Sequence, residues 1–129
     1  MRKTITEVHM DISHGVDLER ISRFDALIHK PSFMNGVYTD NERAFILSSA
    51  RPVRTAASSF AAKEAIAKAL GRGLYGLLPR EIEVLRDEKG RPEASLLGRA
   101  AEQYGDRSIS LSISYKDDYT VASCVLWRA

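Results

Sequence analysis

Two carboxylates and a lysine are the side chains of this sequence whose types and spacing could support chemistry. Glu64 and Lys68 are four residues apart in an alanine-rich segment, so they share one face of a helix. On an open helix surface such a pair is an ion pair worth about 0.3–0.5 kcal/mol. Here small and apolar residues surround both side chains, and a charge removed from water needs a partner or an ion. The two residues therefore form either a surface ion pair or part of a site for a charged ligand.

Asp17 is the second candidate carboxylate. It follows an alternating apolar segment and precedes a helical pattern, a position where aspartate often caps the helix. A carboxylate at a strand end can instead bind Mg²⁺, which takes one or two protein carboxylates and completes its coordination with water and substrate phosphate. Asp17 and Glu64 would supply such a pair if the fold brings them together. Both readings of Asp17 are open at this point.

The remaining reactive side chains form no recognisable site. Cys124 is the single cysteine, which excludes an internal disulfide framework and a cysteine-based zinc site, and it is expected in the core. The three histidines have no metal-ligand spacing. No histidine follows Ser112 or Ser114 closely enough to activate a nucleophile, so a serine hydrolase is not expected.

The composition is that of one globular domain over residues 1–129. The chain carries a net charge of +2, and its apolar runs fall short of the roughly 18 residues that a membrane span needs. No apolar signal core follows the basic first residues, so a cytoplasmic protein without membrane contact is expected. Its basic residues do not alternate with aromatic residues as they do in a base-stacking surface, so nucleic-acid binding is not expected.

Positive charge is concentrated in the middle of the chain. Residues 51–91 contain 9 Lys or Arg and 5 Asp or Glu, an excess of four, whereas each flanking segment has one more acidic than basic residue. This excess is either a solvated face or a pocket for a phosphorylated ligand, since Arg and Lys suit phosphate oxygens. The charge distribution alone does not decide between them.

The first half of the chain predicts one strand followed by helices. Apolar residues alternate over 8–16, which predicts a half-buried strand, and Gly15 indicates a bend or the close approach of another segment. A helical spacing follows over 18–29, and residues 31–36 are expected to form a loop. A capping box at Thr39 and Glu42 predicts a short helix. The longest helix is expected from Pro52 to Leu70, ended by Gly71.

The second half predicts mainly strands. They are expected near 82–85, 94–97, 108–114 and 120–127, with one or two helical turns over 99–103. Turns at 88–90 and 116–118 join them into hairpins. The order of elements predicts an α+β fold, in which a largely antiparallel sheet packs against a long central helix.

Several short motifs occur in a fixed order along most of the chain. They are Val16-Asp17-Leu18, Tyr38-Thr39-Asp40-Asn41-Glu42, Phe60-Ala61-Ala62-Lys63-Glu64-Ala65 with Lys68 after it, Asp87-Glu88-Lys89-Gly90-Arg91-Pro92, and Ser112-Ile113-Ser114. Together they resemble holo-acyl-carrier-protein synthase, the short single-domain class of 4′-phosphopantetheinyl transferases. The resemblance implies the phosphopantetheinyl transferase fold. It also implies transfer of phosphopantetheine from coenzyme A to a serine of an acyl carrier protein or carrier domain, with Mg²⁺ as cofactor and 3′,5′-ADP as product.

The resemblance also implies roles for individual residues. Asp17 and Glu64 would be the metal ligands, and Lys68 would lie beside the phosphates. The coenzyme would contact Lys63, the turn Gly90, Arg91 and Pro92 near the adenine, and the strand end Ser114 and Tyr115. Arg23 and Lys30 would dock the carrier protein. Members of this class usually form homotrimers with active sites between subunits.

Three positions depart from the family pattern. Tyr115 replaces a histidine, Ser59 replaces a basic residue, and Arg20 replaces an acidic residue. Tyrosine can donate one hydrogen bond but cannot become cationic at neutral pH. The alternative function is therefore a non-catalytic or weakened relative that binds coenzyme A or a carrier protein. The general base is either a carboxylate or a metal-ordered water, and the carrier could serve fatty-acid, polyketide or peptide synthesis.

Overall fold

The main sheet of the computed structural model has three antiparallel strands. The structure describes residues 11–71 and 76–128. Strands β1 (Ile12–Arg20), β5 (Tyr119–Trp127) and β4 (Ser108–Lys116) lie in the order β1-β5-β4. Ile12 pairs with Trp127 at one end of β1 and Arg20 pairs with Tyr119 at the other. The hairpin predicted between the last two strands is confirmed.

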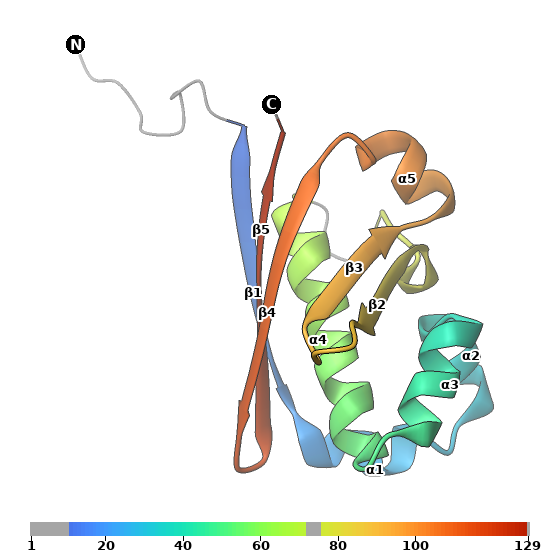
Figure 1. Cartoon of the computed structure of the whole chain (residues 1–129). Helices are drawn as coiled ribbons and strands as arrows, with labels where there is room; N and C mark the ends of the chain where they lie inside the picture. Colours follow the sequence, from blue (N-terminus) through green and yellow to red (C-terminus); the bar gives the residue numbers. More distant parts are fainter. Residues whose placement is uncertain (1–10, 72–75, 129) are drawn as a thin grey trace.

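Helix α4 (Pro52–Ala69) lies along one face of this sheet, between the sheet and the smaller hairpin (Figure 1). Proline is compatible with the first helical turn, where the missing N–H would have no partner, and Gly71 follows the helix with a φ of +77°. Five of its alanines are fully buried between Ala56 and Ala65, so both sides of the helix can be packed closely. The helix predicted over 52–70 is confirmed. In the described part of the chain, no helix has the length and apolar character to cross a membrane.

Gly15 allows α4 to approach β1 closely. A Cβ at this position would lie 2.1 Å from the Ala65 carbonyl oxygen and 2.8 Å from the Ala69 nitrogen. Both neighbours are helix backbone, which cannot move aside as a flexible side chain can. The close approach predicted at Gly15 is confirmed, and it keeps Asp17 of β1 next to the last turns of α4.

Gly15→Ala is expected to lower the free energy of unfolding by about 3 kcal/mol, because overpacking of this kind forces a backbone shift. Urea unfolding followed by circular dichroism measures it. Gly36→Ala is the matched control, since no atom lies within 4 Å of the added Cβ. Equal stability of the two variants would contradict the tight packing at Gly15.

Four short helical elements cover one end of α4. They are η2 (Ile21–Arg23), α1 (Phe24–Leu27), α2 (Pro31–Val37) and α3 (Asp40–Ser48). The predicted capping box is present at the start of α3, where the Glu42 nitrogen donates to the Thr39 hydroxyl and the Thr39 nitrogen donates to the Glu42 carboxylate. A second core cluster, with Phe24, Tyr38 and Ile46 fully or almost fully buried, fills the space between these helices and α4.

A second, two-stranded sheet lies on the other side of α4. The 3₁₀ turn η4 (Pro79–Glu81) leads into β2 (Ile82–Arg86), which pairs antiparallel with β3 (Pro92–Leu96). In the connecting turn, Asp87 Oδ1 accepts hydrogen bonds from the Lys89 and Arg91 nitrogens, and Gly90 has a φ of +83°. Helix α5 (Gly98–Tyr104) follows, as the sequence predicted.

Two expectations about the first half of the chain are wrong. The helix expected from Leu18 is strand as far as Arg20, because β5 continues to pair with β1 to that point, and the helical turns begin only at Ile21. The loop expected over 31–36 is α2, since Pro31 occupies the first helical turn, where its fixed φ suits the helix. Residues 8–10 of the predicted first strand and 72–75 of the predicted connection lie outside the described residues.

The outer face of the main sheet carries apolar side chains on β1 and β5, whereas β4 presents serines there. Alternation along β1 and β5 directs six large side chains away from α4, each with between 37% and 61% of its surface exposed. They are Ile12, Val16, Leu18, Tyr119, Val125 and Trp127. Several large apolar side chains exposed on one sheet face are typical of a surface that another protein covers.

Candidate active site

Asp17 lies in the middle of β1, opposite Ala122 of β5. Because strand residues alternate between faces, Gly15, Asp17 and Glu19 face α4 while Val16 and Leu18 face outward. Asp17 therefore does not cap a helix, and the capping reading is wrong. Its side chain is 12% exposed and lies against the last turns of α4.

Lys68 joins α4 to β1 at this point. Its Nζ donates to Asp17 Oδ1 at 3.0 Å and to the Val16 carbonyl at 3.1 Å, while about half of the side chain remains exposed. Lys68 is thus paired with Asp17 and not with Glu64, so the simple helix ion pair is not formed. An ammonium group is fixed beside one candidate metal ligand and is still accessible to a ligand.

Glu64 lies one helical turn before Lys68 and is half-buried. Burial raises the pKa of its carboxyl, and the negative charge of Asp17 raises it further. Lys68 contacts Asp17, and Glu64 lies one helical turn earlier on the same face of α4, so the fold brings Asp17 and Glu64 to the same region. Oδ2 of Asp17 is buried without a hydrogen-bond partner, so one carboxylate oxygen is unsatisfied.

The carboxylate pair fits a hard divalent cation. An unsatisfied buried carboxylate oxygen and a second, partly desolvated carboxylate are the oxygen ligands that Mg²⁺ prefers. Among the described residues, no group of three or more His, Cys, Asp or Glu has ligand geometry. Two protein ligands suit Mg²⁺, which usually keeps several waters and binds substrate phosphate.

Glu19 is a third carboxylate that the sequence reasoning missed. It is 12% exposed and pairs with Arg23 Nη2 at 3.2 Å. Burial raises the pKa of its carboxyl, with the negative charge of Asp17 as the second cause. The period of two from Asp17 would have placed Glu19 on the same face, but the strand was expected to end at Val16.

Lys63 is not accessible from the surface, so it cannot make the contact with the coenzyme that the resemblance implies. Its side chain is fully buried, and Nζ donates to Glu42 Oε1 at 2.7 Å, to the Pro79 carbonyl at 3.0 Å and to the Ile82 carbonyl. Desolvation lowers the pKa of Lys63, and the Glu42 carboxylate opposes that shift. Lys63 faces α3 and β2, whereas Glu64, about 100° away around the helix, shares the face of Lys68.

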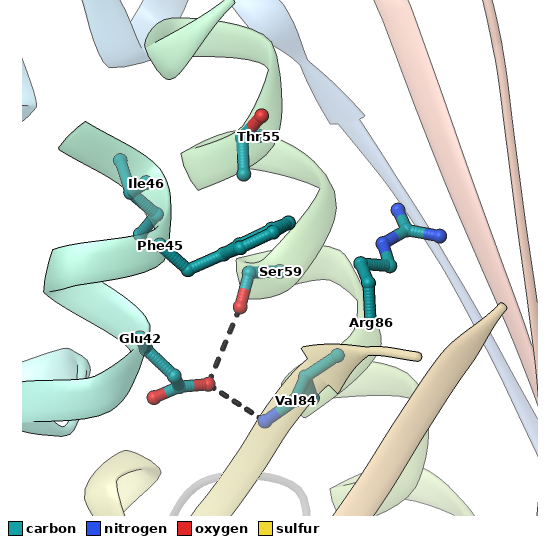
Figure 2. Close-up of a pocket in the computed structure, with 7 residues that line it drawn as sticks. All are labelled: Glu42, Phe45, Ile46, Thr55, Ser59, Val84 and Arg86. Carbon is teal, nitrogen blue, oxygen red and sulfur yellow. Dashed lines mark hydrogen bonds between the residues drawn. The ribbon is translucent and has the colours of Figure 1, made fainter. Parts of the chain in front are cut away.

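Glu42 completes this internal network. Figure 2 shows its carboxylate directed from α3 toward Ser59 of α4 and Val84 of β2, and the Val84 nitrogen donates to Oε2 at 2.8 Å. Ser59 Oγ lies 3.4 Å from the same oxygen and is almost fully buried. The Glu42–Lys63 pair therefore joins α3, α4 and the start of β2, and Ser59 belongs to this interior.

A second charged cluster surrounds Tyr115 at the end of β4. Its ring is 53% exposed, and the Arg54 guanidinium lies 3.9 Å from the ring centroid. Arg86, at the end of β2, is directed away from Glu42 (Figure 2) and donates to the Gly90 carbonyl at 3.2 Å. Burial lowers the pKa of Arg86, and Tyr115 acts in the opposite direction. No described carboxylate forms an ion pair with Arg54 or Arg86.

The two clusters occupy different parts of α4. Arg54 and Glu64 are ten residues apart, which corresponds to about 15 Å along a helix. The structure thus brings Asp17, Glu64 and Lys68 together. Separately it brings Tyr115 to Arg54 and Arg86, and Arg86 to the turn at Gly90. Within one chain, the carboxylate cluster and the arginine cluster therefore remain separate.

Comparisons with known proteins identify the family of this chain. The family model of the 4′-phosphopantetheinyl transferase superfamily matches residues 13–124, which include both clusters. The chain belongs to this superfamily.

This superfamily member is similar to individual relatives over nearly their whole length. The chain is 42% identical over 132 aligned positions to holo-[acyl-carrier-protein] synthase of Chloroflexus aurantiacus, covering 88% of this chain and 96% of the relative. It is 34% identical over 120 positions to the synthase of Caldanaerobacter subterraneus, covering 90% and 94%. The Bacillus anthracis synthase, solved in complex with CoA (3′,5′-ADP), superposes with a TM-score of 0.78 at 29% identity, covering 93% and 99%.

The remaining predicted residues of this superfamily member lie at the end of the molecule formed by η2, α1 and α2. The half-exposed Arg23 guanidinium lies 5.1 Å from the centroid of the Phe24 ring and 5.5 Å from that of Phe60. Lys30 is exposed and directly precedes α2. Arg20, one of the departures, donates to the Tyr119 hydroxyl at 2.9 Å and so contributes to the end of the main sheet.

Proposed function

We propose that this protein is a Mg²⁺-dependent holo-acyl-carrier-protein synthase. It would transfer 4′-phosphopantetheine from coenzyme A to a serine of an apo acyl carrier protein or carrier domain and release 3′,5′-ADP. The observation that carries the proposal is the unsatisfied Asp17 Oδ2 beside Glu64, with the Lys68 ammonium 3.0 Å from the other Asp17 oxygen. The matched relatives carry this activity in their names.

The chain's own residues would act mainly by positioning and charge. Asp17 and Glu64 would hold Mg²⁺, which when bound neutralises charge on the diphosphate. Lys68 would add a fixed positive charge where negative charge develops on the leaving group. The serine oxygen forms a bond to the phosphorus that carries the pantetheine arm, the bond from that phosphorus to the oxygen of 3′,5′-ADP breaks, and the serine proton passes to the general base, a carboxylate or an ordered water. In such a transfer the protein mostly orients groups and stabilises spreading charge.

Arg54, Arg86 and Tyr115 would receive the nucleotide end of the coenzyme. These two guanidiniums have no described carboxylate partner, and a partly buried cation is stabilised by an anion. Gly90, Arg91 and Pro92 adjoin this cluster through the Arg86–Gly90 hydrogen bond, and Ser114 directly precedes Tyr115. The positive charge near Tyr115 would offset the absence of a histidine there and of a basic residue at position 59.

Arg86→Gln is expected to raise the KM for coenzyme A about tenfold with little change in kcat, since one charge-assisted hydrogen bond is worth about 1.5–3 kcal/mol. Steady-state kinetics with varied coenzyme A measures it. Arg99→Gln, an exposed change in α5, is the control and should leave KM unchanged. An unchanged KM in Arg86→Gln would remove Arg86 from the coenzyme site.

The apolar outer face of the main sheet supports a homotrimer. Ile12, Leu18 and Trp127 are exposed on one sheet face, and covering them with another subunit would remove apolar surface from water. A neighbouring subunit could also place its Tyr115 cluster beside the carboxylates of the first, which would complete a site that one chain leaves divided. Light scattering after size-exclusion chromatography should give three times the 14.4 kDa of one chain. A monomer that is fully active would contradict this assembly.

The non-catalytic alternative rests on Tyr115 and Ser59, which depart from the family pattern. Incubation with coenzyme A, Mg²⁺ and a panel of apo carrier proteins, followed by intact mass measurement, separates the two functions. Addition of phosphopantetheine to any carrier supports the enzyme. Coenzyme binding without transfer to any carrier supports the alternative.

We further propose a single cytoplasmic domain that serves fatty-acid or polyketide synthesis.

A further inference from the structure

Among the described residues, three carboxylates lie in the region where β1 faces α4, and two cations form ion pairs with them. Asp17 pairs with Lys68 at 3.0 Å and Glu19 pairs with Arg23 at 3.2 Å, while no described cation forms an ion pair with Glu64. The side chains of Asp17 and Glu19 are each only 12% exposed, and Glu64 is half-buried. The group has one excess negative charge in a partly desolvated place, which favours the entry of a cation.

Arg23 connects this group to the molecular surface. Its side chain is 53% exposed, compared with 12% for Glu19, so its far side faces solvent. The rings of Phe24 and Phe60 hold the guanidinium in place, and Phe60 lies on α4 one turn before Glu64. A guanidinium has five N–H donors, and the contact with Glu19 uses one of them. Arg23 can therefore bind a second acidic group from outside.

Glu19 links the candidate cation site to Arg23 at the surface. Arg23 attracts its carboxylate across the 3.2 Å contact, while the like charge of Asp17, two residues earlier on the same strand face, repels it. A divalent cation held by Asp17 and Glu64 would reverse that repulsion and attract Glu19. Its single 3.2 Å contact with Arg23 would then weaken, since a monodentate contact is readily exchanged.

We propose that Glu19 is a positioning residue that couples the cation site to carrier-protein docking. When Asp17 and Glu64 hold no cation, Glu19 retains Arg23. When they hold one, Glu19 turns toward it and leaves Arg23 to the acidic surface of the carrier protein. The inference rests on the proposed function, because it takes the cation at Asp17 and Glu64 and the carrier at Arg23.

The test measures carrier affinity without turnover. Isothermal titration calorimetry of the full chain, without coenzyme A, gives the Kd of the best-transferred apo carrier protein in Mg²⁺ and in EDTA. We expect the wild type to bind about fivefold more tightly in Mg²⁺, the lower end of typical coupling between sites. In Glu19→Gln the two Kd values should be equal and close to that of the wild type in Mg²⁺. Linkage requires the carrier to raise the Mg²⁺ affinity of the wild type by the same factor.

Three further results make the test decisive. Glu102→Gln, an exposed change in α5, should keep the wild-type ratio, and Arg23→Gln should bind weakly in both buffers. Circular dichroism establishes that each variant is folded. A wild-type ratio near one, or the same ratio in wild type and Glu19→Gln, would overturn the coupling while transfer activity stands. Absence of both carrier binding and transfer in the wild type would overturn the proposed function as well.

Discussion

Glu64→Gln is expected to reduce phosphopantetheine transfer about a thousandfold at saturating Mg²⁺. The substitution keeps the size of the side chain but removes one of the two carboxylates that would hold the cation. Loss of metal-assisted charge stabilisation is worth several kcal/mol, and about 4 kcal/mol corresponds to a thousandfold change in rate. The measurement is the rate of carrier modification by intact mass across a Mg²⁺ titration.

The fold should survive this change, because Glu64 is half-buried and forms no ion pair with a described cation. Removing a carboxyl whose pKa is raised by burial and by Asp17 also removes a repulsion, so thermal stability should not fall. Glu102→Gln serves as the matched control and should retain full activity. Full transfer activity in Glu64→Gln would remove Glu64 from the metal site.

Lys63→Met is expected to lower the free energy of unfolding by about 3–5 kcal/mol. The methionine fills a similar volume, but it leaves the fully buried Glu42 carboxylate without its cation. It also leaves the Pro79 and Ile82 carbonyls without the ammonium donor. The large effect thus comes from an uncompensated buried charge, and urea unfolding measures it.

A double variant separates charge from packing. Glu42→Gln combined with Lys63→Met removes both charges and should recover part of the lost stability, because the neutral amide can still accept from the Thr39 or Val84 nitrogen. Lys89→Met, in the exposed turn between β2 and β3, is the control and should change stability little. A Lys63→Met protein as stable as that control would show that the buried pair is not needed.

Local signals were sufficient for much of the fold. The capping box at Thr39, the helix between Pro52 and Gly71, and the alternating serines of β4 each depend on residues close in sequence. The length of β1 depends instead on β5, which is about a hundred residues away, and so its last three residues resembled a helix. Pro31 was taken as a loop signal although it also suits a first helical turn.

The candidate site was only partly accessible from sequence for the same reason. Family motifs indicated Asp17, Glu64 and Lys68, and the contact between Asp17 and Lys68 joins residues 51 positions apart. Glu19 was missed because its face depends on how far β1 extends. The environment of Lys63 depends on α3 and β2 packing onto α4, which no local pattern records.

The distance along α4 between Glu64 and Arg54 has a consequence for genetics. In the proposed trimer, each catalytic centre takes its carboxylates from one subunit and its arginines from the neighbour. A cell that produces Glu64→Gln chains together with Arg54→Gln, Arg86→Gln chains would assemble mixed trimers. At some of their interfaces, the intact carboxylates of one subunit meet the intact arginines of the other. Two alleles that each fail alone would therefore complement one another.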